Sequence, residues 1–232
     1  MNLSRSFFQW AKLLQQLLGL AAQISAEMKL FMQEWGFRKR GNFFFKIKND
    51  LAFCVYLEQP TGLVYSGFCV MPLYLPAESR YLTYGDRLNA FSPCPVGPLP
   101  VDGDAAQWAE QLRFALAEYI FPFFDSIANP QVLDLFLNEK NKKIRAYFFC
   151  PDLDLYRLRL YTKRYLRQWD ELSSLLAKSE AVLQKSPHVQ GPIADQFRRE
   201  CTALAQSAVH PADAKAGLEA IISGTKSALF HL

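Results

Sequence analysis

The sequence has few of the side chains that carry most catalytic chemistry. Among its 232 residues are only three histidines, His188, His210 and His231, and none stands at a spacing typical of a catalytic or metal-binding motif. Neither G-x-x-x-x-G-K-S/T nor G-x-G-x-x-G occurs, so no phosphate-binding loop is recognisable. The G-x-S-x-G element of serine hydrolases is also missing. We therefore expect no cofactor, no metal and no enzyme of these classes.

Cysteine forms no disulfide or zinc-binding pattern. The five cysteines are odd in number and include no C-x-x-C pair. Cys54 and Cys69 stand in apolar runs, where a free cysteine packs as a small hydrophobic side chain. We therefore predict free thiols in a reducing compartment, and a cytoplasmic location.

An uninterrupted apolar run that could cross a membrane is also missing. The stretch 13–24 follows Lys12 and is interrupted by three glutamines, which favours an amphipathic helix over a secretory signal or a membrane span. Few basic residues flank its apolar stripe, 7–18, so we expect this helix to pack against protein, within the chain or across a homodimer. The net charge of +4 permits an acidic partner without requiring one.

Hydrophobic and aromatic residues are abundant, at 50% and 14% of the chain, and can form a large packed core. Alternating apolar residues predict three strands, at 42–48, 51–58 and 63–71. Short turns at Asn49-Asp50 and 60–62 join them into an antiparallel meander. Pro72 and Pro76 end the third strand.

Helical periodicity dominates the rest of the chain. The segment 6–35 is expected to end at Gly36, and Asp104 to begin a helix that Pro122 kinks or breaks. Asn129-Pro130 begins another helix. Beyond a candidate fourth strand at 144–149, the pattern predicts one long helix from Asp152 or Asp154 to about Lys185. The last forty residues predict one or two helices interrupted at His210-Pro211. The fold class is thus α+β: a small antiparallel sheet of three to four strands packed against helices in a domain 1–150, with a C-terminal helical hairpin in an extension, 151–232.

Two basic clusters are the most visible charged features. The first is the basic triplet, Arg38, Lys39 and Arg40, which Lys46 and Lys48 follow. The second has interleaved tyrosines, an arrangement that some single-strand nucleic-acid grooves use, so nucleic-acid binding is one alternative function. The solvated face of an amphipathic helix explains the same pattern. The second cluster contains Lys140, Lys142, Lys143, Arg145, Arg157, Arg159, Lys163, Arg164 and Arg167.

Several short motifs, in order, resemble a bacterial family catalogued as domain of unknown function 4304. They are Trp35-Gly36-Phe37-Arg38-Lys39-Arg40-Gly41-Asn42-Phe43, Leu57-Glu58-Gln59, Phe68-Cys69-Val70, Tyr84-Gly85-Asp86-Arg87-Leu88 and the helix 108–124. The resemblance covers about residues 26–150. It implies a helix packed on a small antiparallel sheet, and it implies no activity or catalytic residue.

The leading hypothesis is a non-enzymatic binding protein with a protein partner. A further alternative is a carboxylate enzyme that uses Glu58 or Asp86 beside a tyrosine or arginine, which requires these groups to lie together in a cleft. We predict no catalytic residue. The candidate binding residues are Arg38, Lys39, Arg40, Glu58, Tyr84 and Arg87.

Overall fold

The computed structural model describes residues 19–231 apart from 21, 61, 77–83, 101, 128, 138–146, 148–151 and 187–188. The predicted N-terminal stripe 7–18 lies outside the described residues. So do most of the candidate strand 144–149 and the first four residues of the second basic cluster.

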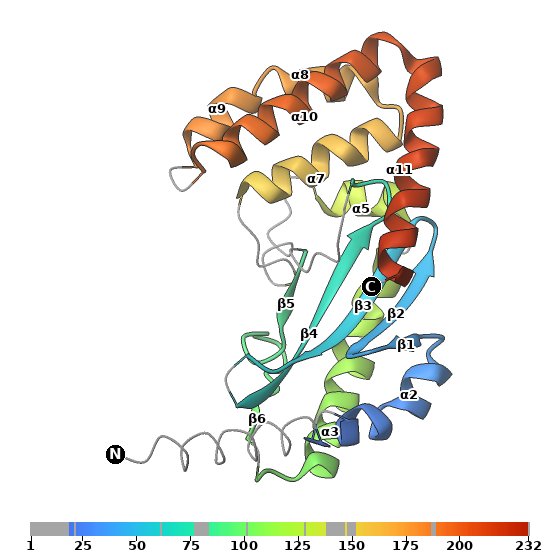
Figure 1. Ribbon diagram of the computed structural model, residues 1–232, viewed down its shortest axis with the longest axis vertical. Coiled ribbons are helices and arrows are strands. Elements are labelled where there is room, and N and C mark those ends of the chain that lie inside the picture. Colours follow the sequence, from blue (N-terminus) through green and yellow to red (C-terminus); the bar gives the residue numbers. More distant parts are fainter. Residues whose placement is uncertain are drawn as a thin grey trace, which may run out of the picture. The chain divides into compact units, whose positions relative to one another are not determined.

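The protein is α+β, as the sequence predicts, and its antiparallel sheet packs with helices (Figure 1). The described part of the sheet has six strands rather than three or four. Their order is β1-β2-β3-β4-β5, and β6 pairs with β4. The strands are β1 (Arg38–Arg40), β2 (Phe43–Lys48), β3 (Leu51–Glu58), β4 (Leu63–Pro72), β5 (Gly85–Arg87) and β6 (Leu99–Pro100).

The three strands predicted from alternation are confirmed as β2, β3 and β4. The turn between β2 and β3 consists of Asn49 and Asp50, whose φ angles are 50° and 59°. Asparagine and aspartate tolerate this left-handed conformation better than other non-glycine residues, so the turn forms without a glycine. Strand β4 ends at Pro72, because proline cannot donate to a further ladder hydrogen bond.

Two further strands are short. The segment 80–91 is open in the sequence to a short strand, a turn at Gly85-Asp86 or both, and β5 lies within it, whereas β1 is not predicted. The basic triplet is itself the strand β1, and it pairs antiparallel with β2, with Arg38 opposite Phe45. Strand β5 pairs antiparallel with β4, with Gly85 opposite Cys69. A side chain at Gly85 would overlap the carbonyl oxygen of Phe68, so glycine allows this close approach.

The chain divides into two compact units. Unit 1 comprises 1–47, 52–70 and 85–126; unit 2 comprises 48–51, 71–84 and 127–232. The predicted division into 1–150 and 151–232 stays a prediction. The turn of the β2–β3 hairpin, the end of β4 and residues 129–137 group with the C-terminal helices.

The core of unit 1 is aromatic. It includes residues of α2 (Lys29–Glu34), α3 (Ala105–Ala115) and α4 (Phe121–Ser126). Phe124 lies at its centre, with ring centroids 5.0 Å from Phe53 and 6.2 Å from Phe68. As predicted, Gly36 closes α2 with a φ of 79°.

Between α3 and α4, the helix widens into a π-helix, η1 (Leu116–Ile120). The N–H of Phe121 donates to the carbonyl of Leu116, five residues earlier. Pro122, which has no N–H, follows immediately. The predicted irregularity at Pro122 is thus a change of helix type just before the proline.

Unit 2 is mainly helical. The predicted single helix to Lys185 is wrong, because three shorter helices occupy this segment. The first ends where Arg167 adopts a φ of 57°, and the N–H of Gln168 donates to the carbonyl of Lys163. The interruption at His210-Pro211 is confirmed. The helices are α5 (Pro130–Phe136), α7 (Asp152–Tyr165), α8 (Trp169–Leu176), α9 (Ser179–Gln184), α10 (Pro192–Val209) and α11 (Pro211–His231).

We predict that Gly85→Ala lowers the free energy of unfolding by about 3 kcal/mol, because the new methyl group collides with rigid backbone. Gly97→Ala is the matched control, since nothing lies within 4 Å of the position that its new methyl group would take; we expect a change within about 0.5 kcal/mol. Urea unfolding followed by circular dichroism measures both. Equal losses would contradict the close approach of β5 to β4.

Candidate functional site

The structure brings together two of the predicted binding residues, Glu58 and Arg87. Glu58 at the end of β3 and Arg87 in β5 form an ion pair. The Arg87 guanidinium also lies 5.0 Å from the ring centroid of Tyr65. Because 46% of the Arg87 side chain is exposed, solvent screens this pair, and it contributes little to stability.

Asp86 does not form a carboxylate pair with Glu58. Asp86 and Arg87 are consecutive in β5 and lie opposite Phe68 and Gly67 in turn, so their side chains point to opposite faces of the sheet. Burial raises the pKa of Asp86, partly offset by the backbone N–H of Arg87. Glu58 instead lies against the positive charge of Arg87. This arrangement does not favour a pair that exchanges protons.

The remaining predicted residues lie elsewhere. The basic triplet forms β1, at the opposite end of the strand order from β5, and its first two residues are exposed. Tyr84 belongs to unit 2, where its buried hydroxyl donates to the backbone carbonyl of Asp154 at 3.2 Å. Glu58 and Arg87 belong to unit 1. Within unit 1, the structure therefore brings Glu58 and Arg87 together but does not bring the basic triplet to them.

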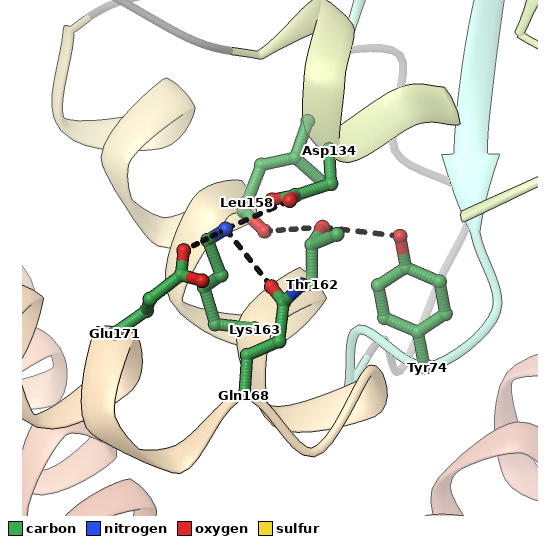
Figure 2. A network of polar contacts seen from close by, with 7 residues as sticks. All are labelled: Tyr74, Asp134, Leu158, Thr162, Lys163, Gln168 and Glu171. Carbon is green, nitrogen blue, oxygen red and sulfur yellow. Dashed lines mark hydrogen bonds and ion pairs between the residues drawn. The ribbon is translucent and has the colours of Figure 1, made fainter. Parts of the chain in front are cut away.

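Several cations of the second basic cluster are engaged inside unit 2. The Lys163 ammonium lies 2.7 Å from Asp134, 2.9 Å from the amide oxygen of Gln168 and 2.5 Å from Glu171 (Figure 2). Burial alone would lower the pKa of Lys163, but hydrogen bonds to Asp134 and Glu171 outweigh it and raise this pKa. The lysine is therefore an internal link between α5, α7 and α8.

Tyrosines of α7 are likewise occupied by packing and hydrogen bonds. Tyr165 stacks on Tyr74 with centroids 4.4 Å apart, and its hydroxyl donates to Asp50 at 3.0 Å. Burial, followed by the hydrogen bond to Asp50, raises the pKa of Tyr165 to about 12. The hydroxyls of Tyr74 and Thr162 are 3.1 Å apart (Figure 2). These rings hold unit 2 together and do not form an open stacking surface.

A pocket of about 170 Å³ lies between α7 and α10, entirely within unit 2. On its polar side, Arg157 forms a bidentate pair with Glu200, at 2.6 and 2.9 Å. Its apolar side includes Ile193, which is 59% exposed. The lining residues are Leu153, Asp154, Arg157, Ile193, Gln196, Phe197 and Glu200.

Asp154 is the polar residue of this pocket whose side chain has no hydrogen-bond partner among the described residues. Among the described residues, no hydrogen bond to its carboxylate is found. Burial raises the pKa of Asp154; Arg157 lowers it and Glu200 raises it. Because Arg157 balances the charge of Glu200, the ionised pocket carries one negative charge from Asp154. The site is thus suited to a cation.

Sequence reasoning missed this pocket. The sequence presents Asp154 only as a possible helix start and an acidic neighbour of the basic cluster, and it does not single out Glu200. Glu200 lies 43 residues after Arg157, and no local motif links them. The pair depends on how α10 packs against α7, which the sequence does not show by spacing.

Searches among known proteins found no matching family model, no matching curated protein and no matching solved structure. The family resemblance therefore stays a prediction. Within the described part of the chain, no group of three or more His, Cys, Asp or Glu side chains could hold a metal ion. None of the described helices combines the length and apolar character needed to cross a membrane.

We predict that the two carboxylates on Lys163 contribute unequally. Asp134 and Lys163 each have 11% of the side chain exposed, so Asp134→Asn leaves a buried cation without its main counter-charge and costs about 3 kcal/mol. Glu171 is 59% exposed, and Glu171→Gln costs less than about 1 kcal/mol. Urea denaturation of both variants compares the losses. Equal effects would show that burial does not set the strength of these pairs.

Proposed function

We propose that the protein is a non-enzymatic binding protein, and that its pocket between α7 and α10 receives a cationic side chain of a protein partner. The observation that carries this proposal is Asp154, a half-buried carboxylate without an assigned partner in a defined pocket. A lysine or arginine would supply the missing counter-charge and make charge-assisted hydrogen bonds.

The shape and lining of the pocket suit a long basic side chain. Phe197 and Leu153 are buried and offer apolar surface to an alkyl stem, while Asp154 offers an acceptor to its charged end. Lysine and arginine have this combination of an apolar stem and a polar head. Ile193 remains 59% exposed at the same site and can contact the surface from which the side chain projects.

The size of the pocket favours a side chain over a cofactor. Sites for drug-sized ligands and cofactors usually have volumes of about 300–1,000 Å³. This pocket is about 170 Å³, which is closer to the volume of one side chain. The partner class that this supports is therefore a protein or peptide.

Binding is also better supported than catalysis. A carboxylate enzyme commonly uses one group as an acid and another as a base. Both oxygens of Glu200 already accept hydrogen bonds from the Arg157 guanidinium, so this carboxylate is poorly placed to exchange a proton with a substrate. Asp154 is then the one carboxylate of the lining that can serve a ligand, and no histidine or cysteine lines the pocket.

Two described cations of the second basic cluster, Arg157 and Lys163, do not support the alternative of nucleic-acid binding. Arg157 and Lys163 are paired with carboxylates, and Tyr161 is buried. Stacking on a nucleobase needs an accessible ring, and a phosphate contact needs a cation free to exchange its counter-ion. We propose the cytoplasm as the location, since Cys54 and Cys69 are buried and neither forms a disulfide.

We expect Nα-acetyl-lysine methylamide to bind unit 2 weakly, with a Kd of about 1 mM, which corresponds to about −4 kcal/mol. The uncharged norleucine analogue should not bind measurably. Asp154→Asn should weaken lysine binding about tenfold or more, because a hydrogen bond to a charged group contributes about 1.5–3 kcal/mol. Chemical-shift titration in phosphate buffer, which contains no competing amine, measures each affinity.

The matched control for this titration is Asp195→Asn. Asp195 also lies near the start of α10, but its side chain is 62% exposed and does not line the pocket. Its removal changes the net charge by the same amount and should leave binding unchanged. Equal binding of the lysine and norleucine compounds, or equal loss in the two variants, would rule out the proposed role of Asp154.

Asp154→Asn should also stabilise the unliganded protein at pH 7. A carboxyl pKa that is raised on folding means that the folded chain holds the proton more tightly than the unfolded chain. Ionised Asp154 therefore destabilises the fold above its folded pKa, and this effect disappears below the unfolded value of about 3.9. Thermal unfolding from pH 7 to pH 3 should show a stabilisation that shrinks as the pH falls. Lower stability of the variant at pH 7 would contradict the raised pKa.

A further inference from the structure

Arg164 is a buried cation of α7 for which the described residues provide no counter-charge. It is 8% exposed, and its Nε has no hydrogen-bond partner. Burial lowers the pKa of Arg164, and no carboxylate among the described residues offsets this effect. The same helix shows that partners are otherwise supplied, because Arg157 has Glu200 and Lys163 has Asp134.

This burial is energetically expensive. A guanidinium stays protonated in proteins, so it cannot avoid the cost by losing its proton. An unpaired charge removed from water destabilises a fold unless an opposite charge reaches it. A methionine or leucine at this position would bury similar apolar surface without this cost, so packing alone does not explain an arginine.

We infer that Arg164 forms a binding site for a small carboxylate anion between α7 and α11. A carboxylate can accept two parallel N–H bonds from the planar guanidinium, a geometry in which arginine exceeds lysine. The site is separate from the pocket at Asp154, and the inference does not depend on the function proposed for that pocket.

Gly217 of α11 and Tyr161 of α7 lie near Arg164. Its Nη2 lies beside Gly217 of α11, 3.5 Å from where a side chain on that glycine would begin. A glycine inside a helix is less favourable than an alanine, and a methyl group here would lie in ordinary contact with the guanidinium. Tyr161 lies close enough to influence the Arg164 charge, and its phenol can donate a hydrogen bond.

The local charge favours a carboxylate over a phosphate. Arg157 packs on Tyr161 with its guanidinium 5.6 Å from the ring centroid, but its charge is already balanced by Glu200. Arg164 therefore supplies one net positive charge. A carboxylate monoanion is balanced by this charge, whereas a phosphate dianion would leave a second negative charge buried and unpaired. The small exposed fraction of Arg164 favours a compact anion.

We expect acetate and propionate to raise the midpoint of thermal unfolding of the full chain by about 3–6 °C at ten times the Kd. Chloride and phosphate at the same ionic strength should raise it by less than half as much. Arg164→Met should raise the midpoint without added anion, because the unpaired charge is gone, and should abolish the response to acetate. Bis-Tris propane chloride is the buffer, since it contributes no carboxylate.

Two further variants make the test specific. Arg199→Met removes one charge from an exposed position of α10 and should keep the full acetate response. Arg164→Lys keeps the charge but loses the planar contact, and its response should be smaller than that of the unmodified protein. Asp154→Asn should also keep the acetate response. The experiment therefore distinguishes an incorrect proposal for the pocket at Asp154 from an incorrect inference about Arg164.

The inference is overturned by any of three outcomes. Acetate could stabilise Arg164→Met as much as the unmodified protein, or chloride and phosphate could match acetate. Unliganded Arg164→Met could also be less stable than the unmodified protein, which would show that Arg164 already has a favourable partner. Isothermal titration of the unmodified protein with acetate provides a test without any variant, and we expect one site per chain.

Discussion

The burial of cationic side chains along α7 is the constraint on which unit 2 depends. Each buried charge needs an opposite charge, and the residue that supplies this charge determines whether the cation links helices, lines a pocket or can bind a ligand. Lys163 reaches acceptors on α5 and α8 and becomes a structural link. Arg157 reaches Glu200 and thereby fixes one wall of a pocket. Arg164 reaches no described carboxylate, which leaves it available to a ligand. One helix thus supplies both the cohesion of this unit and its candidate binding chemistry.

The two units are stabilised by different kinds of interaction. In unit 1, aromatic rings around Phe124 fill the space between the sheet and its helices, and the ion pair of Glu58 and Arg87 lies at the surface. Such a unit can lose a surface charge with little effect, because its stability comes from apolar burial. Unit 2 has buried polar networks, whose members depend on one another. Substitutions that leave the fold intact are therefore easier to find on the exposed polar surface of unit 1 than among the buried polar networks of unit 2.

Local signals in the sequence predict the meander, the cap at Asp104, the start at Asn129-Pro130 and the break at Pro211, because each depends on neighbouring residues. They do not reveal the break at Arg167, since an arginine in a left-handed conformation has no sequence signature comparable to that of glycine. Strands as short as β1 and β5 carry no readable alternation. The candidate site is hardest to predict, because Arg157 and Glu200 meet only through the packing of two helices. Of the residues predicted to bind, Glu58 and Arg87 meet, whereas Tyr84 serves as a buried hydrogen-bond donor in the other unit.

The basic triplet has a consequence for how the protein behaves at high concentration. It forms β1, the outermost strand on that side of the described sheet, and an outermost strand presents unpaired backbone groups to other chains. Three consecutive positive charges make the approach of an identical strand unfavourable, because like charges would face one another across the new ladder. Residues that first suggest a recognition surface thus protect the sheet from adding further copies of itself and so from growing into aggregates.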